Sequence, residues 1–279
     1  MLALTIALIP LLPLFASGAS TTKDSCFDCH LIREGTSAKF TNDVHYKNTL
    51  SCADCHGGDP SDGTANGSMS ASRGFRVRVQ RQGIPDYCGR CHSDTNMMAK
   101  YNPQGRVDQL ALYKTSVHAT QLAAGKRAAE CVDCHSVHDI RAGNDPLSPA
   151  SPQHVTDTCA KCHSAEADLV RRSPHGRGFN TQQRPGCVAC HASHATQPAG
   201  TATLTGATSI CVRCHRNANS GPGRAAAQIA QVLAGLEAAG PGSKDALERA
   251  RVAVHTFNAA AVRRAAEPPP AAAPASPPN

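Results

Sequence analysis

The sequence Cys-x-x-Cys-His occurs seven times, and these motifs use all 14 cysteines of the 279-residue chain. The motif attaches haem covalently, because its two thiols bond to the porphyrin vinyl groups and the adjacent imidazole binds the iron. The cysteine pairs are Cys26 and Cys29, Cys52 and Cys55, Cys88 and Cys91, Cys131 and Cys134, Cys159 and Cys162, Cys187 and Cys190, and Cys211 and Cys214. The predicted proximal ligands are His30, His56, His92, His135, His163, His191 and His215. The sequence therefore predicts seven c-type haems.

Paired cysteines also form zinc sites and disulfides. A zinc site would combine two such pairs, or one pair with distant histidines, and it does not need a histidine directly after the second cysteine. Seven pairs are an odd number, and each is followed by histidine. Covalent haem is therefore favoured over both alternatives.

Seven further histidines match the seven motifs in number. They are His45, His118, His138, His154, His175, His194 and His255. Haem iron accepts a second axial ligand, so this count predicts bis-histidine iron, with His154 the weakest candidate. Methionine is the competing ligand, but only Met69, Met97 and Met98 follow the N-terminal segment, which is too few.

Sequence order suggests which histidines share an iron. The motifs can be grouped in consecutive pairs, with the seventh left over. If the first haem of each group takes the next spare histidine along the chain, His30 pairs with His45, His92 with His118, His163 with His175, and His215 with His255. A histidine three residues after a proximal ligand cannot reach the far side of the same haem. This excludes His138 for the His135 haem and His194 for the His191 haem. Sequence order leaves open how His138, His154 and His194 are shared among the haems of His56, His135 and His191.

An internal repeat divides the chain into pairs of motifs with a histidine between them. The predicted divisions are a signal peptide at 1–19, dihaem units at 20–72, 73–142 and 143–200, a seventh haem with a helical hairpin at 201–267, and a disordered Pro/Ala-rich tail at 268–279. About 37 residues per haem are too few for an ordinary core, so haem must form most of it. The predicted fold is mainly α with much irregular loop, organised around seven covalently bound haems.

Three local features complete this prediction. Breaks at Gly221–Gly223 and Gly240–Gly242 delimit expected helices at 224–239 and 243–267, with Ser243 as a cap and His255 on the second helix. The arginine-rich stretch 73–81 could include a short strand around Phe75–Val79. Short helices should carry the motifs and the spare histidines.

The N-terminus and the charge bear on location and partners. Met1–Ala19 is apolar and predicts a cleaved export signal, although no Lys or Arg precedes the apolar run, which leaves an anchor as the alternative. We expect a periplasmic or extracytoplasmic protein with no membrane span after cleavage. The formal charge is +7. Seven haems would add about 14 propionate charges of opposite sign, so the basic residues are better propionate partners than a nucleic-acid surface.

The motif pairs resemble the doubled-CXXCH multihaem cytochromes, which include c3-type cytochromes and periplasmic donors to nitrite reductase. The resemblance covers about 26–266 and depends most on the similar segments Cys131–His138 and Cys187–His194, together with Tyr113–His118, Cys52–Asp59 and the closing helix with His255. It implies stacked haems with bis-histidine iron that pass electrons along the chain.

Three functions fit the sequence. The leading hypothesis is a heptahaem electron carrier, not an enzyme, between a membrane quinol oxidase and a terminal acceptor or reductase in anaerobic-type respiration. The alternatives are a reductase of nitrite, hydroxylamine or a sulfur oxyanion with one open iron, and a subunit of an extracellular haem conduit. Redox proteins are the expected partners, and an oligomer is allowed.

Overall fold

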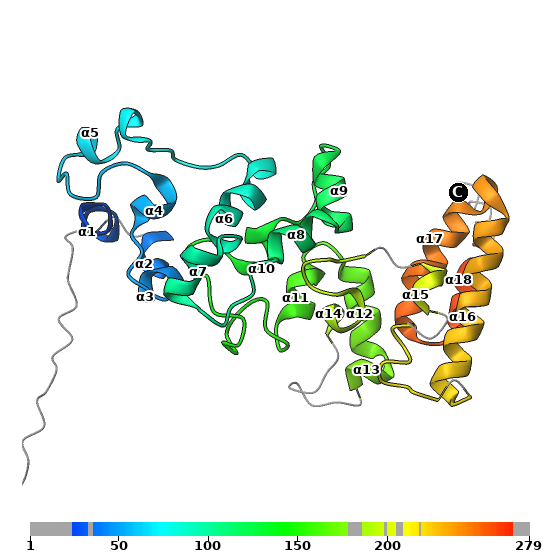
Figure 1. Ribbon diagram of the computed structural model, residues 1–279. Helices are drawn as coiled ribbons and strands as arrows, with labels where there is room; N and C mark the ends of the chain where they lie inside the picture. The colour runs from blue at the N-terminus through cyan, green and yellow to red at the C-terminus, as the bar shows by residue number, and fades with distance from the viewer. Residues whose placement is uncertain are drawn as a thin grey trace, which may run out of the picture. The chain divides into compact units, whose positions relative to one another are not determined.

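The computed structural model describes residues 24–32, 36–177, 186–197, 200–204, 209–217 and 219–269 (Figure 1). These residues form helices and irregular loops and contain no strand. The predicted fold class, mainly α with much irregular loop, is confirmed. The predicted strand around Phe75–Val79 is wrong: this stretch is irregular, and Val77 is 75% exposed. The predicted signal peptide and most of the predicted tail lie outside the described residues.

The chain divides into two compact units. The first contains the described residues of 1–35 together with Ser51–Val77, and the second contains Thr36–Leu50 and the chain from Arg78 onward. The first unit consists of α1 (Ser25–Ile32), α4 (Cys52–His56), α5 (Ala65–Ser68) and the 3-10 turn η1 (Ala71–Arg73). Its two segments are joined where the Ser25 N–H donates to the Pro60 carbonyl at 2.9 Å and the Ser25 hydroxyl donates to the Asp62 carbonyl at 2.7 Å.

The second unit begins with short helices. They are α2 (Thr36–Phe40), α3 (Val44–Lys47), η2 (Arg81–Gly83), α6 (Ile84–His92), α7 (Thr95–Tyr101), α8 (Gln109–Lys114), α9 (Val117–Ala123), α10 (Cys131–His135), α11 (Val155–Ala160), α12 (Ser164–Arg172), α13 (Pro174–Arg177), α14 (Cys187–His191) and α15 (Thr201–Leu204). The segment Thr36–Leu50, which sequence order grouped with the first two motifs, lies in this unit. The predicted division into dihaem units stays a prediction.

The second unit ends in longer helices: α16 (Gly221–Ala238), η3 (Gly240–Ser243), α17 (Lys244–Ala253), η4 (Val254–Thr256) and α18 (Ala259–Ala266). Residues 221–223 begin α16 instead of preceding it, because Ser220 accepts a hydrogen bond from the Gly223 N–H and proline is tolerated in a first turn. The predicted cap at Ser243 does not form, since the hydroxyl donates to the Leu236 carbonyl of α16 and the Gly240 carbonyl of η3. The hairpin of α16 and α17 is as expected.

The expected second helix is interrupted near its middle. Phe257 has φ +54°, in the left-handed region, which ends η4. Asn258 then caps α18 by accepting from the N–H groups of Ala260 and Ala261. One continuous helix becomes two, and α18 packs with α16 and α17 (Figure 1).

Apolar packing is concentrated in these C-terminal helices. Eight of the twelve buried hydrophobic residues belong to α16, α17 and α18, with Leu233, Ala250 and Val262 almost fully buried. Elsewhere in the described chain the buried hydrophobics are Phe40, Leu122, Val155 and Ala167. The motif helices α4, α10 and α14 bury none of their residues. Something other than side chains must therefore supply the core around the motifs.

Candidate haem-binding site

The even-numbered cysteine motifs share one local structure, whereas the odd-numbered motifs vary. The second, fourth and sixth motifs form the five-residue helices α4, α10 and α14, each running from the first cysteine to the histidine. The first and third motifs lie within the longer helices α1 and α6, while the fifth begins in α11 and the seventh lies in turns. The alternation supports the repeat of paired motifs that the sequence suggested.

The three short motif helices end in the same backbone conformation. Gly57, Ser136 and Ala192 directly follow the proximal histidines and have φ of 69°, 71° and 61°, with ψ of −163°, −174° and 171°. This region is almost restricted to glycine, so Ser136 and Ala192 are strained. A Cβ at Gly57 would lie 2.3 Å from the Gly74 carbonyl oxygen, which makes glycine necessary there.

An ion-paired cap fixes the start of α10. Glu130, 2% exposed, accepts from the Val132 N–H, and Asp133 accepts from the Glu130 N–H. Arg81 donates to Glu130 at 3.2 Å, to the Ala128 carbonyl at 2.7 Å and to Asp133. Burial raises the pKa of the Glu130 carboxyl, while the Val132 N–H and the Arg81 charge act to lower it.

Five spare histidine rings lie opposite five proximal rings. The centroid distances are 5.8 Å for His45 and His92, 6.3 Å for His118 and His163, 6.0 Å for His194 and His135, 5.9 Å for His175 and His215, and 6.0 Å for His255 and His191. The similarity of these five distances points to one shared arrangement.

This spacing fits a metal ion between the rings. Two side chains in direct contact approach to about 4 Å. A metal bound to both imidazoles needs two bonds of about 2 Å plus the distance from each ring centre to its nitrogen, roughly 6 Å in total. No group of three or more His, Cys, Asp or Glu that could hold a metal occurs in the described parts of the chain. Two imidazoles in this arrangement fit haem iron, whose other donors belong to the macrocycle.

Hydrogen bonds orient several of the rings. The Nδ1 atoms of His45, His255 and His56 lie 2.9 Å from Asp43 Oδ1, 3.0 Å from the Val252 carbonyl and 3.0 Å from the Arg76 carbonyl, respectively. Metal-binding histidines typically donate their second ring N–H in this way, which leaves Nε2 for the metal. These contacts fit a role as axial ligands.

At least one imidazole of each facing pair favours its neutral form. Burial lowers the pKa values of His92, His118, His135, His175 and His191, and the opposite imidazole lowers each of them further. Burial and the Arg106 charge lower the pKa of His194. Since a metal binds neutral imidazole, little proton release would oppose ligation.

The ring positions differ from the pairing by sequence order. The rings opposite His45, His118 and His175 belong to His92, His163 and His215, each one repeat later than expected. For His45 the reason is a pair of long-range hydrogen bonds: the Val44 N–H donates to the Ile140 carbonyl and the Ile140 N–H donates to Asp43, which anchors this segment in the second unit.

The C-terminal helices also take part. His255 faces His191 instead of the expected His215. Phe257, two residues on, contacts the His175 ring edge-on at 4.2 Å between centroids. The arrangement of His194 opposite His135 is one that sequence order left open.

The other spare histidines have different surroundings. His138 is half-buried in the loop after α10. His154 is exposed at the N-terminus of α11, and no ring contact is recorded for it in the described structure. The prediction that both are iron ligands stays a prediction.

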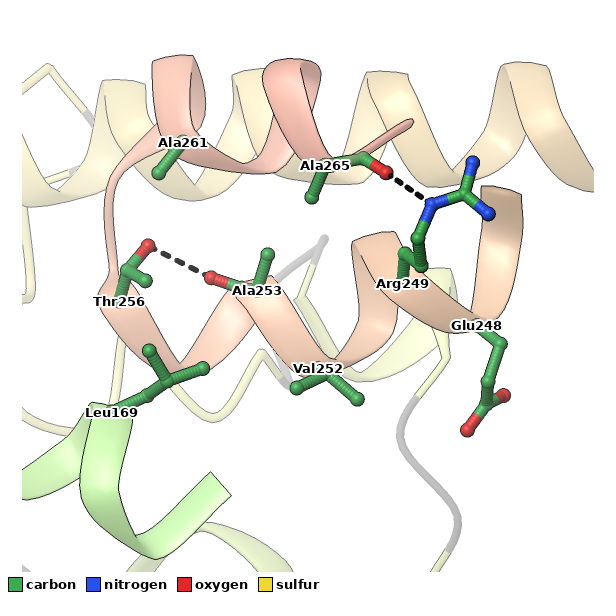
Figure 2. Close-up of a pocket in the computed structure, with 8 residues that line it drawn as sticks. All are labelled: Leu169, Glu248, Arg249, Val252, Ala253, Thr256, Ala261 and Ala265. Carbon is green, nitrogen blue, oxygen red and sulfur yellow. Dashed lines mark hydrogen bonds between the residues drawn. The ribbon is translucent and has the colours of Figure 1, made fainter. Parts of the chain in front are cut away.

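An apolar recess lies beside His255. Figure 2 shows its wall, formed by Leu169 of α12 and by residues of α17, η4 and α18, with Arg249 donating to the Ala265 carbonyl at 3.0 Å. Val252, whose carbonyl lies 3.0 Å from His255 Nδ1, and Thr256, the residue after His255, line it. Sequence periodicity did not indicate this recess, because residues of α12, α17, η4 and α18 line it together.

The cysteines of successive motifs are neighbours. No cysteine forms a disulfide. A hydrogen bond from Cys131 lowers the pKa of Cys88, and one from Cys159 lowers the pKa of Cys187. Burial is the main cause of the raised pKa of both Cys134 and Cys190. Cys211 adds to the effect at Cys190, and Cys162 adds a smaller effect at Cys134, after those of Asp133 and Glu130. In the first unit, burial raises the pKa of Cys52, and the nearby Asp24 and then Cys26 add to this effect.

Covalent attachment motifs with facing imidazoles define a multihaem c-type cytochrome. Residues 44–164 match the family described as Cytochrome c3, and this segment contains four of the seven motifs. This match supports a multihaem electron-transfer cytochrome of the c3 type, a family with covalently bound haem. No significant match was found among curated proteins or solved structures. Within the described residues, no helix is long and apolar enough to cross a membrane.

Proposed function

We propose that this protein is a heptahaem electron relay with bis-histidine iron, working between a membrane quinol oxidase and a terminal acceptor or reductase. The carrying observation is the set of five facing imidazole pairs, 5.8 to 6.3 Å apart between ring centroids. An iron held from both sides has no free position for a substrate. Such an iron is suited to electron transfer.

The chain's residues would each have a defined part. Haem supplies the one-electron ferric/ferrous chemistry. The seven cysteine pairs would attach the haems covalently, and the paired imidazoles would bind their irons. Two neutral imidazoles favour a lower potential than a histidine and a methionine would.

Neighbouring attachment points support a relay. The contacts of Cys88 with Cys131 and of Cys159 with Cys187 link successive motifs, and Cys134 and Cys190 are influenced by cysteines of the next motif. Porphyrins bonded to neighbouring sulfurs would have neighbouring edges. In the second unit, this series would place the five haems in the order of their motifs.

We further propose that the protein is exported and acts in the periplasm or another extracytoplasmic space with redox proteins as partners. The apolar Met1–Ala19 segment supports export, and haem c is attached after translocation. A surface charge near −7 in the loaded protein, from +7 and about 14 propionate charges, would favour partners with basic docking faces.

One observation favours a second candidate function, a multihaem reductase with one open iron. His154 is exposed at the start of α11, and within the described residues its ring faces no proximal histidine. If His154 is not a ligand, six spare histidines are left for seven irons. An iron without a sixth ligand could bind nitrite, hydroxylamine or a sulfur oxyanion.

Two measurements on the purified protein test these proposals. Intact-mass analysis should give seven haems per chain. Carbon monoxide, which binds only an open ferrous iron, should leave the absorption spectrum of the reduced protein unchanged. Stoichiometric binding to one haem, together with a spectral change on adding nitrite or hydroxylamine to the oxidised protein, would favour the reductase.

A further inference from the structure

Three spare histidines are preceded by a buried polar residue two positions earlier. The segments are Asp43-Val44-His45, Ser116-Val117-His118 and Ser173-Pro174-His175. The exposed fractions of Asp43, Ser116 and Ser173 are 0%, 0% and 3%. Each of the three residues directly precedes the helix that carries its histidine.

The first two segments are anchored in the same way. The Val44 N–H donates to the Ile140 carbonyl at 2.7 Å, and the Val117 N–H donates to the Thr196 carbonyl at 2.9 Å. Ile140 lies five residues after the proximal His135, and Thr196 lies five residues after the proximal His191. Asp43 and Ser116 therefore occupy equivalent positions, and the chain itself shows that serine is compatible with this site.

The side chains make different contacts. Asp43 Oδ1 accepts from both the backbone N–H and the ring Nδ1 of His45, each at 2.9 Å, and Oδ2 accepts from the Ile140 N–H at 2.7 Å. The Ser116 hydroxyl accepts from the Ala119 N–H at 3.1 Å. The Ser173 hydroxyl donates to the Val170 carbonyl, and His175 Nδ1 is buried without a hydrogen-bond partner in the described structure.

We propose that Asp43 is a positioning residue that, through His45, lowers the reduction potential of the haem bound by Cys88, Cys91 and His92. A carboxylate that accepts the Nδ1 proton gives the imidazole more negative charge, and this stabilises ferric over ferrous iron. Because the carboxylate is fully buried, solvent screens it little. The corresponding serines carry no charge, so the haems of His163 and His215 lack this effect.

This inference rests on the proposed axial role of His45, and exchanging the residues of the repeat tests it. The variants are Asp43→Ser and the reciprocal Ser116→Asp, both as holoprotein with seven haems. The measurement is a potentiometric titration followed by visible absorption and electron paramagnetic resonance. In Asp43→Ser one midpoint potential should rise by about 59 mV. For a one-electron couple this corresponds to about a tenfold change in the ferric-to-ferrous ratio at a fixed potential. In Ser116→Asp one midpoint should fall.

Asp94→Ser is the matched control. Asp94 also caps a helix, accepting from the Asn96 and Met97 N–H groups, and it lies two residues after His92, but it is exposed and bonds no ring. Its replacement removes the same charge near the same motif and should leave all midpoints in place. An equal rise in this control would show a general charge effect and overturn the proposal.

The remaining outcomes are also decisive. Unchanged midpoints in Asp43→Ser, with all irons still low-spin, would overturn the proposal while leaving the relay intact. A new high-spin iron in Asp43→Ser would show that Asp43 only holds His45 in place, which also overturns it. If Asp43→Ser does not fold, Ser116→Asp decides the question. A wild type in which the His92 haem is already high-spin would instead contradict the axial role of His45.

Discussion

Replacing Ser136 by glycine should stabilise the protein. Ser136 directly follows the proximal His135 and has φ 71° and ψ −174°, a conformation almost restricted to glycine. Such a residue costs about 1–3 kcal/mol in the folded state, whereas the added freedom of glycine in the unfolded chain costs about 0.5–1 kcal/mol. Ser136→Gly should therefore raise the free energy of unfolding by about 1 kcal/mol.

Ser93→Gly is its control. Ser93 follows the proximal His92 in the same way but has φ −107°, so glycine relieves no strain there and should lower the stability by about 0.5–1 kcal/mol. Gly57→Ala, at the position equivalent to Ser136, should destabilise by more than about 2 kcal/mol, because its Cβ would lie 2.3 Å from the Gly74 carbonyl oxygen.

The assay is guanidinium unfolding of the holoproteins, followed by far-ultraviolet circular dichroism and by the haem absorption band. The two signals should change together, and the transition midpoint should move in opposite directions for Ser136→Gly and Ser93→Gly. If both glycine variants lose stability equally, the strain argument is refuted.

Three further predictions concern the site and the core. His255→Ala should make one haem high-spin without loss of haem, and a variant that already lacks the haem of Cys187 and Cys190 should show no such change, since His255 faces His191; a new high-spin iron in that background would favour the His215 haem instead. Arg81→Ala should cost about 2 kcal/mol at neutral pH, because it leaves the buried Glu130 carboxylate without its cation. Since the folded-state pKa of Glu130 is then raised further, the loss should shrink as the pH falls and the carboxyl is protonated, and a pH-independent loss would contradict this. Leu233→Ala should cost about 2–5 kcal/mol in thermal unfolding, because Leu233 is 1% exposed in the C-terminal core; a smaller loss would mean that this core contributes little.

The sequence predicted the features that are encoded locally. The cysteine motifs, the repeat of paired motifs and the mainly helical class follow from short patterns. The C-terminal hairpin was predicted because Gly-Pro-Gly at 240–242 separates two apolar helical stretches. Its interruption was not, since nothing in the sequence marks a phenylalanine for a positive φ such as that of Phe257.

The pairing of the rings could not be predicted from sequence order. Order assigns each spare histidine to its own repeat, whereas three-dimensional contacts bring His45, His118 and His175 to the first motif of the next repeat. A signal was present in part: the recurrence of a polar residue, valine and histidine at 43–45 and 116–118 marks equivalent segments. These segments are held by long-range backbone hydrogen bonds to Ile140 and Thr196, which no local sequence pattern reveals.

Similarly, Gly57 after His56 was a visible sign of the positive φ at the end of the short motif helices. Ser136 and Ala192 at the equivalent positions concealed it, because neither residue favours that conformation.

The central claim is that the spare imidazoles close the haem irons. Low-temperature electron paramagnetic resonance of the oxidised protein, with spin quantitation against the haem content, tests it most directly. The relay requires low-spin ferric iron for all seven haems, including the five with facing imidazole pairs. High-spin iron at two or more of the seven haems would contradict the claim, and a single high-spin iron that shifts with nitrite or hydroxylamine would favour the reductase.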